Sequence, residues 1–209
     1  MQGVDEKLIL DAAAGLRMMW FNKDHPNVVY LDQRTDEELD AAHLRKLKAS
    51  GYSGRKRRHF KTRTMKGDFR KLDFPDETFK LVVWDPPFRC YHGKTGIFSE
   101  EYGRLQKETW PDDIRCGASE LWRVLQAFGV LIFKWNDNEI RFRSVLRLFP
   151  VEPLFGQITS GAKARRGKRC HTAWFCFMKL PKTGQKTLEI RVAARTRERM
   201  RVGVTEGVI

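Results

Sequence analysis

The sequence is poor in cysteine and has no long apolar run. Only 4 of its 209 residues are cysteines, none in a Cys-x-x-Cys pair and none at the spacing of a zinc module. We therefore expect reduced thiols in a cytoplasmic protein without a bound metal. No run approaches the ~20 apolar residues that cross a bilayer, and the first residues lack the basic-then-apolar order of a signal peptide. A secreted or membrane-embedded protein is not expected.

Acidic residues are outnumbered by basic ones. The chain carries 40 Lys and Arg against 26 Asp and Glu, a formal net charge of +14. An excess of this size favours a polyanionic partner such as nucleic acid, with a merely basic soluble protein as the plainer alternative. Much of the charge lies in residues 44–66, 161–169 and 181–209. We interpret these stretches as a basic insertion, a hairpin loop and a loose C-terminal extension to one domain spanning residues 1–180.

Short apolar runs that end at a charged residue recur along the chain. The four clearest are 8–10, 28–31, 79–84 and 130–133. They show little polar alternation, which is typical of strands buried on both faces of a parallel sheet. Residues 112–125 and 138–149 place apolar side chains at steps of three and four, which predicts helices. The fold class predicted is α/β, with a Rossmann-like, mostly parallel sheet flanked by helices. The runs 153–155 and 173–178 predict a closing antiparallel hairpin.

The most informative motif is Asp85-Pro86-Pro87-Phe88, which directly follows the apolar run at 79–84. In an open α/β sheet, ligands bind outside the carboxyl ends of the strands. There the Asp85 carboxylate and the Pro86 carbonyl can both accept from one amino group, because two successive prolines stiffen the turn. Phe88 offers a ring on which a flipped base can stack. An ordinary Asp-Pro turn is the alternative interpretation.

Two acceptors on one exocyclic amino group have a chemical consequence. They favour a geometry in which the nitrogen lone pair leaves conjugation with the aromatic ring. The nitrogen then becomes a nucleophile towards an activated methyl group. This chemistry needs neither a metal nor a covalent enzyme intermediate.

The motif resembles motif IV of the class I S-adenosylmethionine-dependent amino-methyltransferases, which modify adenine N6 or cytosine N4. The wider pattern is similar to small methyltransferases of phages and mobile elements, over most of residues 8–180 but not the basic insertion or the tail. The further segments that carry the resemblance are 9–21, 24–28, 30–32, 67–69, 74–76, 131–137, 153–157 and 171–174. The resemblance implies S-adenosyl-L-methionine as cofactor and methyl transfer to a nucleobase, with adenine N6 in DNA favoured.

The resemblance also implies where the cofactor binds. A glycine turn after the first strand approaches the methionine part of the cofactor, and Asp11, Ala13 and Gly15 stand at that place. The turn has one glycine where two or three are common, so a plain strand–turn is the alternative. An acid after the second strand binds the ribose hydroxyls, which assigns Asp32 that role. A helix N-cap or a surface acid is the alternative for Asp32.

A second acid is implied at the adenine end of the cofactor. Asp68 stands where the family has an acceptor for the adenine amino group, and Phe69 beside it offers an apolar wall. A simple Gly-Asp turn is the alternative. On the substrate side, Lys134, Trp135 and Asn136 end a strand and are expected to face the same crevice. The long connection over 88–110 has little apolar periodicity, and we expect it to fold over the target base.

Three hypotheses remain open from the sequence. The first is methylation of a nucleobase amino group in DNA. The second keeps the chemistry but takes RNA as substrate, because Asp-Pro-Pro-Phe also occurs in ribosomal RNA guanine-N2 methyltransferases. The third is a non-catalytic nucleic-acid-binding protein on the same scaffold, which the single glycine of the turn favours. The sequence contains no separate target-recognition domain, and its oligomeric state is open.

Overall fold

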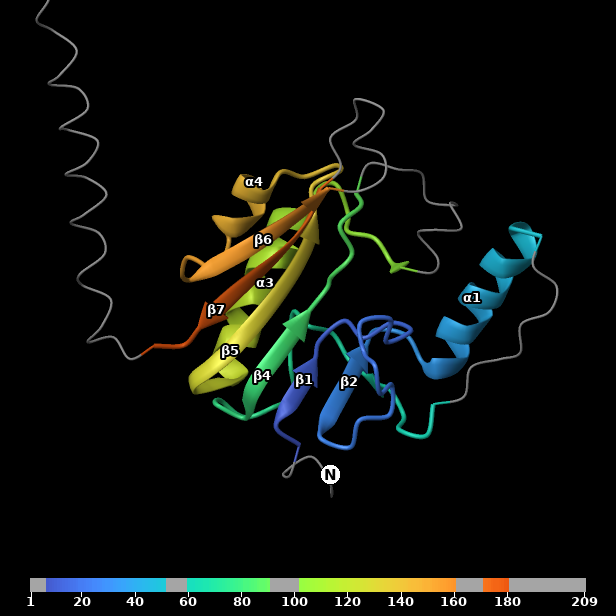
Figure 1. Ribbon diagram of the computed structural model, residues 1–209, viewed down its shortest axis with the longest axis horizontal. Helices are drawn as coiled ribbons and strands as arrows, with labels where there is room; N and C mark the ends of the chain where they lie inside the picture. Colours follow the sequence, from blue (N-terminus) through green and yellow to red (C-terminus); the bar gives the residue numbers. More distant parts are fainter. Residues whose placement is uncertain (1–6, 52–59, 91–101, 161–170, 181–209) are drawn as a thin grey trace, which may run out of the picture. The chain divides into compact units, whose positions relative to one another are not determined.

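Within the described residues, seven strands form one sheet in the order β3-β2-β1-β4-β5-β7-β6 (Figure 1). They are β1 (Ile9–Asp11), β2 (Val28–Asp32), β3 (Met65–Lys66), β4 (Phe79–Trp84), β5 (Leu125–Asn136), β6 (Phe155–Ser160) and β7 (His171–Met178). The first five strands along the chain are parallel to one another. β7 is antiparallel to both β5 and β6. The predicted Rossmann-like α/β class and the closing antiparallel hairpin are confirmed.

The computed structural model describes residues 7–51, 60–90, 102–160 and 171–180. The basic run at 55–58, the hairpin loop at 161–169 and the extension from 181 onward lie outside the described residues. The two ends of the stretch interpreted as an insertion belong to regular elements, since residues 44–49 continue a helix and residues 65–66 form β3. The domain boundaries stay a prediction.

Three helices are described: α1 (Asp36–Ala49), α3 (Trp110–Val124) and α4 (Phe142–Leu146). α1 begins with a capping box, in which Thr35 and Glu38 each accept from the other's backbone N–H. α3 confirms the helix predicted at 112–125. Its Ile114, Ala118 and Leu121 are fully buried, as the spacing of apolar residues requires.

The helix expected over residues 138–149 is shorter in the structure. Only the five residues of α4 are α-helical, because the chain first turns back against β5. The Trp135 indole donates to the Ile140 carbonyl at 3.0 Å, which fixes that turn in the core. The sequence pattern therefore predicted the buried face of this segment correctly and its helical length wrongly.

One face of the sheet is buried more deeply than the other. Trp84 and Phe133 are fully buried in the core that also contains residues of α3, and α3 lies behind β5 and β7 in Figure 1. On the opposite face Val83 and Ile132 are only half-buried. The prediction that strands are buried on both faces holds for β2, whose five residues are all buried, and is wrong for β4 and β5.

Candidate active site

Four charged side chains meet at one edge of the sheet. Asp11 and Asp32 end β1 and β2, Asp85 follows β4, and Lys134 lies near the end of β5. These strands are parallel and adjacent in the order β2-β1-β4-β5, so their carboxyl ends share an edge. This is the edge at which open α/β sheets bind ligands, and the sequence placed all four residues there.

Two adjoining cavities open at this edge. The first has a volume of about 360 Å³ and is lined by the loop after β1 and the ends of β2 and β4. The second, about 340 Å³, lies over the Asp85–Phe88 turn. Both volumes suit small ligands. The residues common to both linings are Asp85, Pro87, Tyr102, Gly103 and Lys134. Ligands in the two cavities would be neighbours, as transfer of a group between them requires.

The Asp85 carboxylate is held in an ion pair. Lys134 Nζ lies 2.5 Å from Asp85 Oδ2, and Lys134 is the one hydrogen-bond donor to this carboxylate among the described residues. About a quarter of each side chain is exposed, 26% for Asp85 and 27% for Lys134. Burial raises the pKa of Asp85 above its ordinary value, and the Lys134 ammonium opposes that rise. An amino group that enters the cavity must therefore share the carboxylate with Lys134 or displace it.

The rest of the predicted catalytic motif also lies in the cavity wall. Pro86 is buried, and Pro86 and Phe88 line the second cavity while Pro87 borders both. Gly103 closes over this turn with a φ of +72°, and a Cβ there would lie 3.0 Å from Pro87 Cγ. Glycine therefore permits both the backbone conformation and the close approach. The Arg89 guanidinium lies 5.8 Å from the centre of the Phe88 ring.

The loop after β1 forms the floor of the first cavity. Ala13 and Gly15 line it, as predicted. Gly15 has a φ of +48°, a conformation that glycine adopts without strain. Its N–H donates to Asp32 Oδ2 at 3.0 Å, which ties this loop to the end of β2. This turn therefore forms with a single glycine, whereas two or three glycines are common in the motif that it resembles.

Asp11 lies beneath this loop and does not line the cavity. Its side chain is fully buried, and Trp20 Nε1 donates to Asp11 Oδ2 at 2.7 Å. The Ala13 N–H contacts Oδ1 at 3.4 Å. Burial raises the pKa of Asp11 to about 7, although the Trp20 hydrogen bond opposes this. Asp11 therefore supports this loop and does not itself line the cavity, unlike the direct ligand contact expected for it.

Asp32 lines the first cavity, as predicted, but it already has a partner. Arg34 donates to Asp32 Oδ1 through its backbone N–H at 3.0 Å and through Nε at 2.9 Å. Arg34 lines the same cavity. A ribose diol at Asp32 would therefore compete with the Arg34 guanidinium, and the sequence did not predict this competitor.

Asp68 is turned away from the cavity, although its neighbours Gly67 and Phe69 line it. Arg70 holds the Asp68 carboxylate, with Nε at 3.0 Å and Nη2 at 2.6 Å. Burial disfavours ionisation of Asp68, but the hydrogen bonds from Arg70 outweigh it and hold the pKa below its ordinary value. Arg70 also reaches Asp113 of α3 at 2.8 Å. Phe69 thus lines the cavity and Asp68 does not, and the roles expected for both at the adenine stay predictions.

The three residues expected to bind substrate point to opposite sides of β5. Lys134 and Asn136 line the second cavity. Trp135 lies between them in sequence, is 1% exposed and stacks on Phe133 in the core. The expectation that Trp135 faces the crevice is wrong, because side chains alternate along a strand. Thr172 of β7, which the sequence did not single out, lines the cavity beside Asn136 and accepts from its amide at 3.0 Å.

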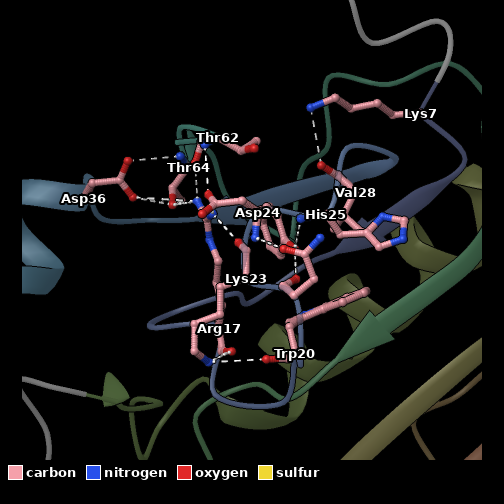
Figure 2. A network of polar contacts seen from close by, with 12 residues as sticks. Lys7, Arg17, Trp20, Lys23, Asp24, His25, Val28, Asp36, Thr62 and Thr64 are labelled. Carbon is pink, nitrogen blue, oxygen red and sulfur yellow. Dashed lines mark hydrogen bonds and ion pairs between the residues drawn. The ribbon is translucent and has the colours of Figure 1, made fainter. Parts of the chain in front are cut away.

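Sequence reasoning also missed a buried arginine in the loop after β1. The Arg17 side chain is 0% exposed and lies at the centre of the polar network in Figure 2. It donates to the carbonyls of Lys23 and Thr62, each at 2.7 Å, and to Thr64 Oγ1 at 3.0 Å. Its guanidinium lies 3.9 Å from the centre of the Tyr30 ring. The contacts join the loop that lines the first cavity to the segment that precedes β3.

Tyr102 closes the outer side of both cavities. Its ring is 51% exposed, and Lys46 of α1 contacts it twice. The Lys46 ammonium donates to the Tyr102 hydroxyl at 3.2 Å and lies 4.7 Å from the ring centre. The described part of the 88–110 connection thus borders the site, as expected. Residues 91–101 lie outside the described residues.

Comparison with known proteins supports the fold. No family model matches the chain, and no curated protein matches its sequence. TrmN from Thermus thermophilus is similar in structure with a TM-score of 0.50 at 17% identity, over 82% of this chain and 43% of TrmN. PH0226 from Pyrococcus horikoshii OT3 has a TM-score of 0.48 at 15% identity, over 82% and 81%. A SAM-dependent methyltransferase from Methanosarcina mazei has a TM-score of 0.47 at 12% identity, over 83% and 92%. At 17% identity, the similarity to TrmN shows a shared fold.

Among the described residues, no helix is both long and apolar enough to cross a membrane. Within the same ranges, no three His, Cys, Asp or Glu side chains gather as a metal ion would require.

Proposed function

We propose that this protein is an S-adenosylmethionine-dependent methyltransferase that modifies an exocyclic amino group of a nucleobase, adenine N6 in DNA. One observation carries the proposal. The Asp85–Phe88 turn lies in the wall shared by two ligand-sized cavities, at the carboxyl edge of an α/β sheet. A catalytic group that must contact a donor and an acceptor at once belongs at such a wall.

The residues of the first cavity suit the methyl donor. Asp32 offers acceptors for ribose hydroxyls, Phe69 offers an apolar wall for adenine, and the Ala13–Gly15 backbone approaches the amino acid part. S-adenosylmethionine supplies an activated methyl group, whose C–S bond breaks as the N–C bond forms, to leave S-adenosylhomocysteine and a methylated base after one amino proton passes to water. Asp85 borders this cavity and places an anionic charge near the cationic donor.

The second cavity suits a flipped base. Asp85 can accept from the amino group, the Pro86 backbone provides a second acceptor in the same wall, and Phe88 and Tyr102 provide aromatic surfaces. Such a clamp withdraws the lone pair from conjugation and makes the nitrogen nucleophilic. The enzyme then contributes orientation and electrostatics, while the donor contributes the leaving group.

Charge supports a nucleic acid as the molecule that carries the base. The chain has a net charge of +14, and Arg89 and Arg104 line the cavities. Lys46 lies beside Tyr102 at the outer wall. Phosphates that flank a flipped nucleotide would meet these cations.

Transfer of labelled methyl groups tests the proposal. Purified protein and labelled S-adenosylmethionine are incubated with DNA and with RNA, and Asp85→Asn is compared with the wild type. We expect labelled adenine in DNA, and a loss of rate on the order of 10²- to 10³-fold for Asp85→Asn with donor binding retained. Asp76→Asn is the matched control, because Asp76 pairs with Arg123 at 2.8 Å and its side chain is 74% exposed.

The rival functions give different outcomes in the same assay. Labelled guanine in RNA would favour the RNA-modifying alternative. Donor binding by calorimetry without transfer to any nucleic acid would defeat the proposed reaction. Nucleic-acid binding without any heat of donor binding would favour a non-catalytic protein on this scaffold.

A further inference from the structure

We propose that Lys134 and Asp85 together read a donor–acceptor edge of the target base, with the amino group donating to Asp85 and Lys134 donating to the ring nitrogen beside that amino group. The inference rests on the proposed function and assigns Lys134 as its specificity-determining residue. It goes beyond that function because it predicts which bases fit and that a single ring nitrogen beside the amino group is recognised.

The geometry places a donor and an acceptor side by side. β4 and β5 are parallel neighbours whose register pairs Trp84 with Phe133, so the next residues, Asp85 and Lys134, emerge together at the edge of the sheet. Their polar atoms are 2.5 Å apart. Both side chains line the second cavity and the wall that it shares with the first. A ligand in the second cavity therefore meets an anionic acceptor directly beside a cationic donor.

Lys134 has hydrogen-bonding capacity to spare. An ammonium carries three donors, and within the described residues Asp85 is its one hydrogen-bond partner. The other group near the ammonium is the Trp174 ring, whose centre lies 5.5 Å away. Lys134 can thus keep its contact with Asp85, or shift toward Trp174, while it donates to a ligand.

Further cations lie around the pair. Arg89 and Arg104, with Tyr102, line the cavities from the 88–110 connection. Burial raises the pKa of Asp85 above its ordinary value, and the Lys134 ammonium beside it opposes that rise. The ion pair presents one acceptor and one donor side by side.

This pattern is complementary to only some amino-bearing base edges. In adenine the amino group lies between the acceptors N1 and N7, and in cytosine it lies beside the acceptor N3. The Watson–Crick edge of guanine presents N1–H beside its amino group, so with the amino group on Asp85 the N1–H donor would face the Lys134 ammonium. The pair thus accepts adenine and cytosine and rejects that edge of guanine, since a buried donor left facing a donor is costly.

Base analogues that lack one ring nitrogen test this directly. Oligonucleotides with adenine, 1-deazaadenine or 7-deazaadenine at the target are assayed with the wild type, Lys134→Met and Lys134→Arg. For the wild type we expect one of the two analogues to lower kcat/KM by about 10- to 100-fold, the range for a hydrogen bond to a charged group. Lys134→Met should react slowly with adenine and show no further loss with that analogue, whereas Lys134→Arg should keep the discrimination.

Lys179→Met is the matched control. Lys179 also forms an ion pair, with Glu77 at 3.2 Å, and donates to the Leu125 carbonyl at the opposite end of β5. The Lys179→Met variant should discriminate between adenine and its deaza analogues as the wild type does. If cytosine is the substrate found, 3-deazacytosine replaces the adenine analogues.

The outcomes separate the inference from the function on which it rests. If both the wild type and Lys134→Met methylate DNA, and the analogues lower kcat/KM equally in the two proteins or in neither, the inference is overturned. The proposed function then still stands. If Lys134→Met lowers kcat/KM equally with adenine and with both analogues, while the wild type discriminates among none of them, Lys134 contacts a phosphate and the inference is overturned. If the wild type binds the donor but methylates no nucleic acid, both the inference and the proposed function are contradicted.

Discussion

At the scale of single residues, three of the four acids expected near a ligand already face a cation. The pairs are Asp32 with Arg34, Asp68 with Arg70, and Asp85 with Lys134. The first two share the spacing Asp-x-Arg, which is visible in the sequence, but only the structure shows that the arginine folds back onto the acid. The third pair depends on strand register, which local sequence does not contain. The sequence thus indicated which acids stand near the carboxyl edge of the sheet, but it did not indicate that Arg34, Arg70 and Lys134 pair with them.

Asp11 gives a prediction about stability and pH. Its pKa is raised by burial to about 7, above the ordinary value that it has in the unfolded chain. The folded state therefore binds a proton that the unfolded state releases between about pH 4 and 7. This contribution to the free energy of unfolding is fully present below pH 4 and is lost as the pH rises to 7, by about 1.4 kcal/mol per pH unit.

Urea denaturation of the wild type and Asp11→Asn from pH 4 to pH 8 measures this dependence. Asparagine does not titrate, so the free energy of unfolding of Asp11→Asn should not show this fall with pH. The difference in free energy of unfolding between the two proteins should therefore change with pH mainly below pH 7. Asp76→Asn, whose side chain is 74% exposed, should follow the wild-type curve. Parallel curves for the wild type and Asp11→Asn would contradict the raised pKa.

At the scale of elements, the cofactor loop is held by one arginine where related patterns use several glycines. Arg17 has a φ of +54°, an uncommon conformation for a residue other than glycine. Its guanidinium lies between the rings of Tyr30 and Phe60, 3.9 and 4.0 Å from their centres. The sequence predicted a weak glycine turn here. It did not predict the arginine, because the partners of Arg17 come from segments up to 47 residues away.

Replacement of Arg17 should loosen this loop. Arg17→Met leaves buried carbonyls and two nearby carboxylates, Asp24 and Asp36, without their cation, and should destabilise the fold by about 3–5 kcal/mol. Arg17→Lys retains the charge but not the planar fork, and we expect it to fold and to bind S-adenosylmethionine more weakly. Calorimetry with the donor, together with thermal denaturation, measures both effects.

Arg123 offers a matched control for the loop. It bonds to the carbonyls of Leu72 and Phe74 and to two carboxylates, but it lines neither cavity. Arg123→Lys should lower stability without a change in donor affinity. Equal effects of the two Arg→Lys variants on donor affinity would show that Arg17 acts on stability alone.

At the scale of the whole molecule, the parallel sheet and its antiparallel end could be predicted, because buried apolar runs and their order along the chain determine them. The length of α4 could not, since it depends on how the chain packs back against β5, whereas strand alternation alone places Trp135 on the face opposite Lys134 and Asn136. The shared wall between two cavities also required the assembled sheet. It brings together Asp85, Lys134 and Tyr102 from distant parts of the chain.

The net charge of +14 predicts salt-dependent binding of nucleic acid. If four phosphates are contacted, affinity for an oligonucleotide should fall by roughly 100-fold when salt rises from about 0.05 to 0.2 M. Fluorescence anisotropy at several salt concentrations measures the slope. Binding of the methyl donor alone should show little of this dependence, and a flat slope for the oligonucleotide would contradict a phosphate-binding surface.

The most direct test of the proposed function is the nucleoside composition of DNA from cells that express this protein and contain no other adenine methylation. The DNA is digested to nucleosides and analysed by mass spectrometry, with cells that express Asp85→Asn as the comparison. We predict N6-methyl-2′-deoxyadenosine in DNA from cells that express the wild type and none in DNA from cells that express the variant. DNA without any base methylated on an exocyclic amino group, from cells in which the folded protein is present, would contradict the function proposed for the Asp85–Phe88 turn.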